Sequence, residues 1–321
     1  MMNTQIFFLY ADRSDVSLSC YVLGDSPDLM AGKKRPAILI CPGGGYFNCS
    51  DREAEPIALK FASMGYHTFV LRYSTYTGTS GFPDLAKPME IKESCIHPHP
   101  MHDIAQAMRL IRAHADEWLV DAERIAVCGF SAGGHNAAMY ATRWQEDADN
   151  PRPAAAILGY PLTDYVYKRD EEARLDPMAQ SFFRKSDFAF LGTETPTQEQ
   201  LEDVSPAQHV SEHTPPTFLW ATAADELVPV QHSLLMAKAL ADHNVPFELH
   251  VFETGMHGLA LADQTTSAAW SQTNSDVAKW AELAGAWLQK RFALPLAEKT
   301  EFEEMLERGE FPGMGNAEGE K

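Results

Sequence analysis

The sequence is short of positive charge and contains no long apolar run. Its 321 residues carry 26 Lys and Arg against 45 Asp and Glu, which gives a net charge of −19 at pH 7. Such an acidic chain is repelled by nucleic acid and by anionic membrane surfaces. No stretch approaches the roughly 20 apolar residues that cross a bilayer, and the N-terminus lacks the basic segment of a signal peptide. We therefore expect a cytoplasmic protein that binds neither nucleic acid nor membranes.

Cysteine is also scarce, and its pattern is not that of a metal site. The five cysteines are odd in number and irregularly spaced, which suits a reducing cytoplasm; they are Cys20, Cys41, Cys49, Cys95 and Cys128. A metal alternative comes from His97, His99, His102 and Asp103. The prolines among them are expected to keep this segment extended, with no strand or helix to fix a ligand geometry. The sequence thus predicts neither a metal nor another cofactor.

What the chain does contain is a series of short apolar segments separated by helical patterns. The segments that read as strands are Ile6–Tyr10, Val16–Leu23, Pro36–Cys41, His67–Leu71, Ile125–Cys128, Ala154–Tyr160, Thr217–Thr222 and Pro246–Phe252. The first two are expected to form a hairpin. Alternation of the others with helices implies a mostly parallel sheet flanked by helices, with right-handed crossovers.

The same pattern predicts the domain organisation. We expect one α/β domain over residues 1–293 and an acidic, partly mobile tail over residues 294–321. A cap-like insertion of short helices is predicted at about 161–214. The Tyr73–Pro100 segment is a long irregular loop that we expect to lie over the functional site. Ser50–Glu53 has the pattern of a helix capping box.

One motif stands at the centre of this organisation. Ser131 lies between Gly129 and Gly133, directly after an apolar strand and before a helix. A serine on such a sharp turn projects its hydroxyl from the sheet, and bulky residues two positions away on either side would collide. The pattern predicts a nucleophilic serine beside a helix N-terminus.

A glycine-rich loop follows an earlier strand. Pro42 is followed by Gly43, Gly44, Gly45 and Tyr46. The loop lacks the Gly-Lys-Ser/Thr ending and the Gly-x-Gly-x-x-Gly pattern of phosphate-binding loops. Because the Gly-x-Ser-x-Gly turn follows later in the chain, we interpret the glycine-rich segment as a loop whose backbone N–H groups point at a substrate oxygen.

A serine nucleophile needs a base and an acid that orients the base. Asp225 and His257 each follow a predicted strand, in the order Ser, Asp, His along the chain. Because parallel strands end at one edge of a sheet, both side chains are expected near Ser131. Asp164 stays open as an alternative acid or a cap residue, and Glu226 is a weaker alternative. Three further histidines are placed within a strand or helix, namely His232, His243 and His250.

These motifs resemble those of α/β-hydrolase-fold serine esterases, in particular the carbohydrate acetyl esterase and acetylxylan-esterase-like branch. The resemblance runs from about residue 36 to residue 289. It implies that Ser131 is the nucleophile, His257 the base and Asp225 its orienting acid. It also implies an oxyanion hole made of the N–H groups of Gly44, Gly45 and Ala132.

One departure refines the resemblance. Pro42 replaces the histidine that opens the glycine loop in the hormone-sensitive-lipase relatives. The Pro-Gly-Gly-Gly-Tyr loop and the following Arg-Glu-Ala-Glu-Pro segment are similar to the carbohydrate acetyl esterases instead. The resemblance therefore implies hydrolysis of short-chain acyl esters, above all O-acetyl groups of oligosaccharides, without a cofactor.

The position of three polar residues after the glycine loop suggests sugar contacts, and we predict that Tyr46, Asn48 and Arg52 bind substrate. An arylformamidase-like or peptidase-like amide hydrolase is the alternative activity, and a non-catalytic binding protein of the same fold is a further one. The sequence leaves open the acyl length, the sugar and the oligomeric state, including a homodimer.

Overall fold

The chain folds around one eight-stranded sheet, which the computed structural model describes within residues 1–78 and 81–309. The strands lie in the order β1-β2-β4-β3-β5-β6-β7-β8. Their bounds are β1 Asn3–Tyr10, β2 Arg13–Val22, β3 Arg35–Cys41, β4 His67–Arg72, β5 Val120–Phe130, β6 Ala155–Gly159, β7 Thr217–Thr222 and β8 Phe247–Phe252. The β1–β2 and β2–β4 pairs are antiparallel, and the pairs from β4 to β8 are parallel. The predicted α/β fold with a mostly parallel sheet is confirmed.

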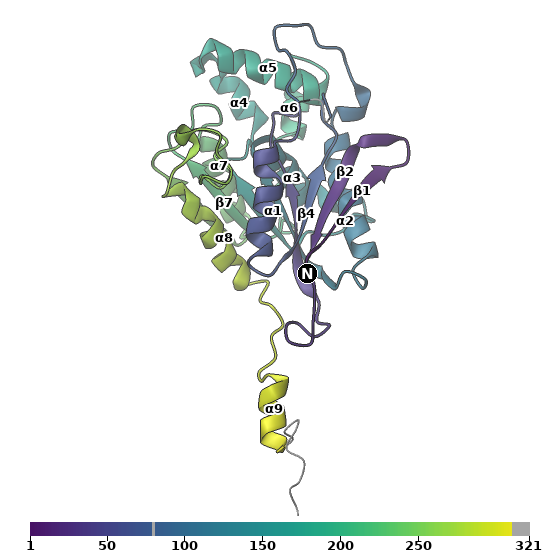
Figure 1. The fold of residues 1–321 in the computed structure, drawn as a ribbon. Helices are drawn as coiled ribbons and strands as arrows, with labels where there is room; N and C mark the ends of the chain where they lie inside the picture. The colour runs from purple at the N-terminus through teal and green to yellow at the C-terminus, as the bar shows by residue number, and fades with distance from the viewer. Residues whose placement is uncertain (79–80, 310–321) are drawn as a thin grey trace, which may run out of the picture.

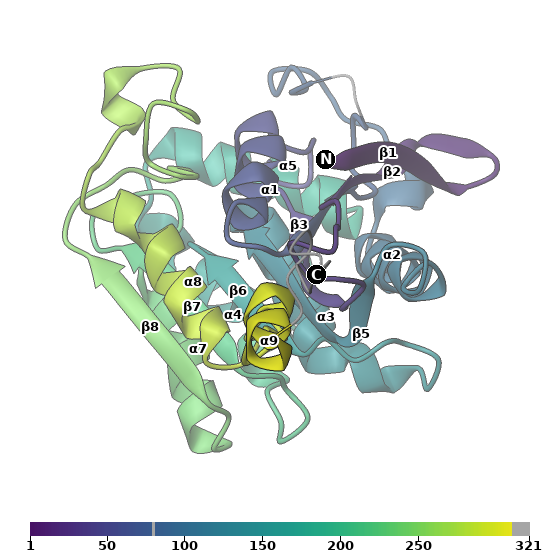
Figure 2. The same ribbon diagram turned by 60° about the horizontal axis from the view of Figure 1, so that its bottom comes forward.

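Helices cover both faces of this sheet (Figures 1 and 2). Helices α1 (Glu55–Ala62) and α8 (Trp280–Gln289) pack on one face, where Ile38 and Ile40 of β3 contribute to the core. Helices α2 (His99–Ala113), α3 (Ser131–Arg143) and α7 (Gln231–Asp242) pack on the other. Burial on both faces explains the apolar runs within the central strands, such as 37–41 in β3, 125–128 in β5 and 155–158 in β6.

The segment between β6 and β7 forms a group of helices at the top of Figure 1. These are α4 (Tyr165–Glu171), α5 (Pro177–Leu191) and α6 (Gln198–Asp203). We refer to residues 161–214 as the cap. Helix α9 (Glu301–Arg308) projects from the opposite end of the molecule (Figure 1). The remainder of the predicted acidic tail, residues 310–321, lies outside the described residues.

Short 3-10 helices complete the described elements. They span Asp51–Glu53, Glu93–Cys95, Trp144–Glu146, Glu172–Arg174, Pro206–Gln208, Trp270–Gln272 and Val277–Lys279. Within residues 1–78 and 81–309, no helix combines the length and apolar character required to cross a bilayer.

Two local expectations are wrong, each for a physical reason. Helix α2 begins at His99, because prolines in the first turn of a helix fit its backbone and start it rather than hold the segment extended. The Ser50 side chain makes no capping hydrogen bond, and a single 3-10 turn follows it. The Glu53 carboxylate of that pattern is used elsewhere, as described below.

Candidate active site

Ser131 sits on the strained turn between β5 and α3. Its backbone φ is +51°, in the left-handed region that residues with a Cβ rarely adopt. A Cβ on Gly129 would lie 2.2 Å from the Gly133 carbonyl oxygen, and a Cβ on Gly133 would lie 2.1 Å from that of Cys41. Both glycines are therefore required by close backbone approach, as the motif predicts.

The side chains of Ser131, His257 and Asp225 form one hydrogen-bonded line. His257 Nε2 lies 2.7 Å from Ser131 Oγ, and His257 Nδ1 lies 2.7 Å from Asp225 Oδ2. The other Asp225 oxygen accepts the backbone N–H groups of Leu227 and Val228 at 3.0 and 2.9 Å. The carboxylate is thus held in place by the turn that opens toward α7, and the imidazole is held between it and the serine.

The electrostatics of the line favour a basic histidine. Burial alone lowers the pKa of His257, but the Asp225 carboxylate, with a smaller contribution from Glu53, more than reverses this effect. The pKa of His257 is therefore raised above its ordinary value of 6.5. A histidine in this state is well matched to accept a proton near neutral pH.

The glycine loop lies directly beside the serine. A Cβ on Gly43 would lie 2.9 Å from Ser131 Cβ, and Gly44 and Gly45 have φ values of +135° and +62°. Within the part of the chain that the structure describes, neither the Gly44 N–H nor the Gly45 N–H has a hydrogen-bond acceptor. Ala132 lies in the first turn of α3, where backbone N–H groups lack intrahelical partners. These donors are available to a substrate oxygen.

Of the three predicted sugar contacts, the burial of one residue, Tyr46, contradicts its role. Tyr46 is 1% exposed, its hydroxyl lies 2.5 Å from His135 Nδ1, and its ring stacks on Phe190. Arg52 donates to the backbone carbonyls of Gly258, at 2.8 Å, and of Thr266. The Tyr46 side chain is therefore part of the core, whereas the substrate contact of Arg52 stays a prediction, because Arg52 is half-buried and its Nη2 has no hydrogen-bond partner among the described residues. Asn48 makes no side-chain hydrogen bond to any described residue, so its substrate contact stays a prediction.

Sequence reasoning missed Glu53. This residue is only 4% exposed, and its carboxylate accepts the Gly43 N–H at 2.7 Å and the Tyr160 hydroxyl at 2.6 Å. Its charge also acts on His257. The one signal in the sequence was its place in the Ser50–Glu53 pattern, which indicated a helix cap instead.

The residues of the metal alternative do not converge. His97 Nε2 lies 3.3 Å from Asp203, whereas Asp103 accepts the Tyr10 hydroxyl and the Ser74 N–H, each at 2.7 Å. Over residues 1–78 and 81–309, no group of three His, Cys, Asp or Glu side chains is arranged to hold a metal ion. Asp164, the alternative acid, accepts the Tyr167 N–H and caps helix α4.

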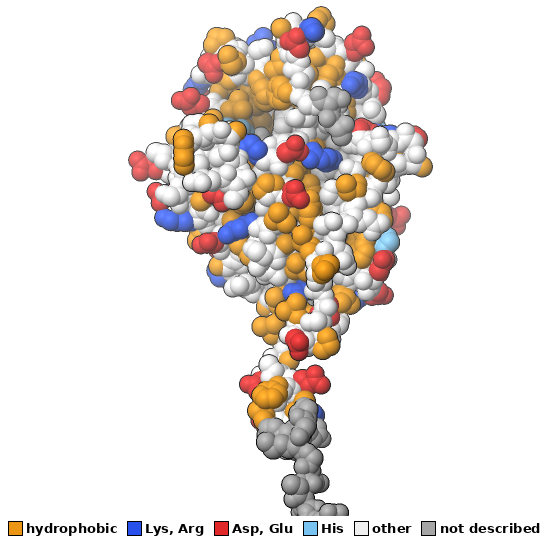
Figure 3. Space-filling model, in the orientation of Figure 1, with side chains coloured by type: hydrophobic (Ala, Val, Ile, Leu, Met, Phe, Trp, Pro, Cys, Tyr) orange, Lys and Arg blue, Asp and Glu red, His pale blue; other side chains and the backbone are white. Residues whose placement is uncertain are grey.

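The cap and the 73–100 loop both pack on the segment that follows the glycine loop. The Ser186 hydroxyl of the cap donates to the Gly45 carbonyl at 2.9 Å, and Phe182 lies against Phe47. In the loop, Thr77 N–H donates to the Phe47 carbonyl and Phe82 contacts the same ring. Figure 3 shows apolar side chains in a hollow below the cap and acidic side chains scattered over the face in view.

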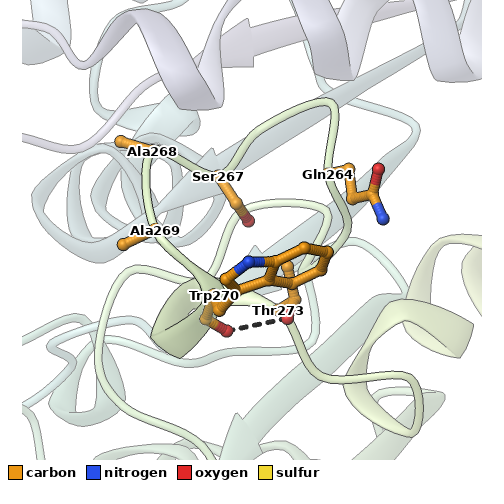
Figure 4. A pocket seen from close by; sticks show the side chains of 6 residues that line it. All are labelled: Gln264, Ser267, Ala268, Ala269, Trp270 and Thr273. Carbon is orange, nitrogen blue, oxygen red and sulfur yellow. Dashed lines mark hydrogen bonds between the residues drawn. The ribbon is translucent and has the colours of Figure 1, made fainter.

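A separate cavity of about 200 Å³ lies in the segment that follows His257 (Figure 4). It is lined by Gln264, Ser267, Ala268, Ala269, Trp270 and Thr273. The Trp270 indole is 77% exposed, which is unusual for so large an apolar ring. The segment is tied to the site by the Arg52 bonds to Gly258 and Thr266.

The parallel sheet, the serine turn and the acid and histidine at later strand ends define an α/β hydrolase. Residues 27–240 match the BD-FAE family model, which is more than half of the chain, and the chain belongs to that family. It is 33% identical over 247 residues to endo-1,4-beta-xylanase B of Butyrivibrio fibrisolvens. That match covers 74% of this chain but 34% of the relative, so the chain spans about a third of its length.

Solved structures agree with this assignment. The acetyl ester-xyloside bifunctional hydrolase of Caldicellulosiruptor lactoaceticus is 32% identical with a TM-score of 0.67, covering 89% of this chain and 96% of that one. The carboxylesterase Cest-2923 of Lactobacillus plantarum is 28% identical with a TM-score of 0.72, covering 92% and 100%. These neighbours are named as an acetyl ester-xyloside hydrolase and a carboxylesterase, and together with the family match they confirm the family resemblance of the sequence.

Proposed function

We propose that the protein is a serine esterase in which Ser131 is the nucleophile, His257 the general base and Asp225 the acid that orients the histidine. The observation that carries this proposal is the line of two 2.7 Å contacts from Ser131 through His257 to Asp225. Such a line lets the imidazole take the serine proton while the carboxylate stabilises the imidazolium that forms.

The reaction proceeds in two halves. Ser131 Oγ attacks the ester carbonyl as His257 takes its proton, and the N–H groups of Gly44, Gly45 and Ala132 stabilise the oxyanion. Collapse of the tetrahedral intermediate releases the alcohol, which receives the proton from His257. Water, deprotonated by His257, then attacks the acyl-enzyme. As the second tetrahedral intermediate collapses, Ser131 Oγ leaves and takes the proton back from His257, and the carboxylic acid is released.

The proposed substrates are short-chain acyl esters, above all O-acetyl groups of oligosaccharides. A Cβ on Gly45 would lie 2.8 Å from the Phe182 ring, so the cap packs closely against the glycine loop. Because this packing leaves little space beside the loop, it favours a small acyl group. A neighbour named as an acetyl ester-xyloside hydrolase supports a sugar ester. The exposed Trp270 ring adds a surface on which a pyranose ring can stack.

Acetate release tests this proposal. Acetylated xylo- and manno-oligosaccharides are compared with p-nitrophenyl acetate, butyrate and octanoate, using wild type, Ser131→Ala and a control, Ser63→Ala. Ser63 is an exposed serine whose hydroxyl donates to the backbone carbonyl of Lys60. We expect acetate release from the sugars, a fall of at least about 10³-fold in Ser131→Ala, and no change in the control. Full activity of Ser131→Ala would overturn the mechanism, and turnover of the synthetic esters alone would overturn the sugar assignment.

A further inference from the structure

Glu53 is a buried carboxylate whose two oxygens are both engaged by uncharged donors. The Gly43 N–H donates to Oε2 at 2.7 Å, and the Tyr160 hydroxyl donates to Oε1 at 2.6 Å. Among the residues that the structure describes, no Lys, Arg or His side chain forms an ion pair with it. Burying a carboxylate without a cation is costly unless hydrogen bonds compensate, so its presence here requires an explanation.

The first of these bonds reaches the glycine loop. Gly43 opens the loop that supplies the Gly44 and Gly45 N–H groups, and its backbone lies against Ser131. By accepting the Gly43 N–H, the carboxylate fixes where the following N–H groups point. A displacement of the loop would move those donors away from the oxygen that develops charge.

The second bond reaches the histidine from another side. The Tyr160 hydroxyl that donates to Glu53 also accepts the N–H of Ala260, three residues after His257. The Tyr160 ring meets the His257 ring edge to face, with 5.0 Å between their centroids. One carboxylate thus joins the glycine loop after β3, a tyrosine after β6 and the histidine segment after β8.

We propose that Glu53 is a positioning residue of the esterase site: through its bonds to the Gly43 N–H and the Tyr160 hydroxyl it holds the glycine loop and the His257 segment in register. The proposal rests on the proposed function, because it assigns Glu53 a role through His257 and the oxyanion-hole donors. In this role Glu53 transfers no proton and does not contact the substrate.

The groups that face His257 come from several elements. Asp225 bonds Nδ1 from the β7–α7 turn, Ser131 bonds Nε2 from α3, and the Glu53 charge acts from the turn after β3. Arg52 lies on the same turn, but its guanidinium is bonded to the Gly258 carbonyl. Against the effect of burial, which lowers the pKa of His257, Asp225 and then Glu53 raise it. Loss of the Glu53 charge therefore lowers the pKa of His257.

The test is the pH dependence of p-nitrophenyl acetate hydrolysis in Glu53→Gln, with Tyr160→Phe and Glu55→Gln as companions. We expect kcat to fall about 10–100-fold in Glu53→Gln with KM changed less than about 3-fold. The acidic limb of kcat/KM, which reports the pKa of His257, moves down by roughly 0.3–1 pH unit. Tyr160→Phe keeps the charge, so kcat falls without the downward shift. Glu55 is an exposed neighbouring carboxylate, and its variant changes neither quantity.

An NMR titration of the His257 imidazole in wild type and Glu53→Gln measures the same pKa without turnover. It therefore separates failure of this proposal from failure of the proposed function. An unchanged His257 pKa together with an unchanged kcat in folded Glu53→Gln would overturn the positioning role. If Glu53→Gln does not fold, Tyr160→Phe decides the matter: wild-type kcat in that variant would contradict the proposed link between the loops.

Discussion

Two carboxylates lie buried near His257, one after β7 and one after β3, and the sequence revealed only the first. Asp225 is 6% exposed and Glu53 is 4% exposed, so burial does not distinguish them. Asp225 bonds the imidazole itself, whereas Glu53 bonds a backbone N–H and a tyrosine hydroxyl. The difference separates a direct partner of the histidine from a group that acts through the scaffold around it.

The largest expected loss of activity comes from changing Asp225, which bonds the His257 imidazole directly. Asp225→Asn leaves the shape of the site but removes the charge that orients and stabilises the imidazolium. We expect kcat/KM for p-nitrophenyl acetate to fall about 10³–10⁴-fold, clearly more than in Glu53→Gln. The matched control is Asp164→Asn. Because Asp164 caps helix α4, we expect this variant to leave kcat/KM unchanged. Equal losses of kcat/KM in Asp225→Asn and Asp164→Asn would contradict the assignment of Asp225.

A third buried carboxylate, in the cap, is expected to affect the stability of the fold rather than the rate of the reaction. Asp187 in the cap pairs with Lys168, and both side chains are nearly inaccessible. Burial lowers the pKa of Lys168 and raises that of Asp187, so each depends on the other for its charge. Lys168→Met leaves Asp187 buried without a cation, and we expect the free energy of unfolding to fall by about 3–5 kcal/mol.

Urea unfolding measures this difference. The control is Lys238→Met, which removes an exposed ion pair with Asp242 and is expected to cost less than about 0.5 kcal/mol. The double variant Lys168→Met with Asp187→Leu should recover most of the loss, because no unpaired charge remains. Equal stability of Lys168→Met and wild type would show that the cap pair is not the source of charge compensation.

The smallest expected effect concerns the exposed Trp270 side chain rather than the buried carboxylates. Removing the Trp270 ring takes away the proposed stacking surface without touching Ser131, His257 or Asp225. We expect Trp270→Ala to raise KM for acetylated oligosaccharides about 3–10-fold and to leave p-nitrophenyl acetate kinetics unchanged. Phe302→Ala, on the exposed face of α9, is the control. Parallel losses on both substrates would contradict a role confined to sugar binding.

The sequence predicted those features that depend on local pattern and on strand ends. The buried parts of the central strands are apolar because both faces are covered, and Ser131 and Asp225 each follow such a strand, whereas His257 follows the edge strand β8. Parallel strands bring their carboxyl ends to one edge, so the three residues met as expected. The glycine requirement at positions 129 and 133 was also readable, because it arises from backbone approach within the turn.

What the sequence did not predict depends on contacts between distant segments. The Ser50–Glu53 pattern is that of a capping box, but Gly43 and Tyr160 offer the Glu53 carboxylate better buried donors than the helix end does. The sequence suggests that Tyr46 and Arg52 are available to a substrate. In the structure the Tyr46 hydroxyl lies beside His135, and the Arg52 guanidinium donates to the Gly258 carbonyl. No spacing along the chain encodes the contacts of Glu53 with Tyr160, of Tyr46 with His135 or of Arg52 with Gly258, since the two residues of each pair lie more than 85 positions apart.

The most direct test of the central claim is the site of covalent modification by a fluorophosphonate, which reacts with activated serines. Peptide mapping of the labelled, folded protein is compared with Ser131→Ala. We expect one adduct, on Ser131, whose formation parallels the loss of p-nitrophenyl acetate hydrolysis and which is absent from the variant. An adduct on another serine, or full hydrolysis by a protein whose Ser131 is unlabelled, would contradict the assignment of Ser131 as the nucleophile.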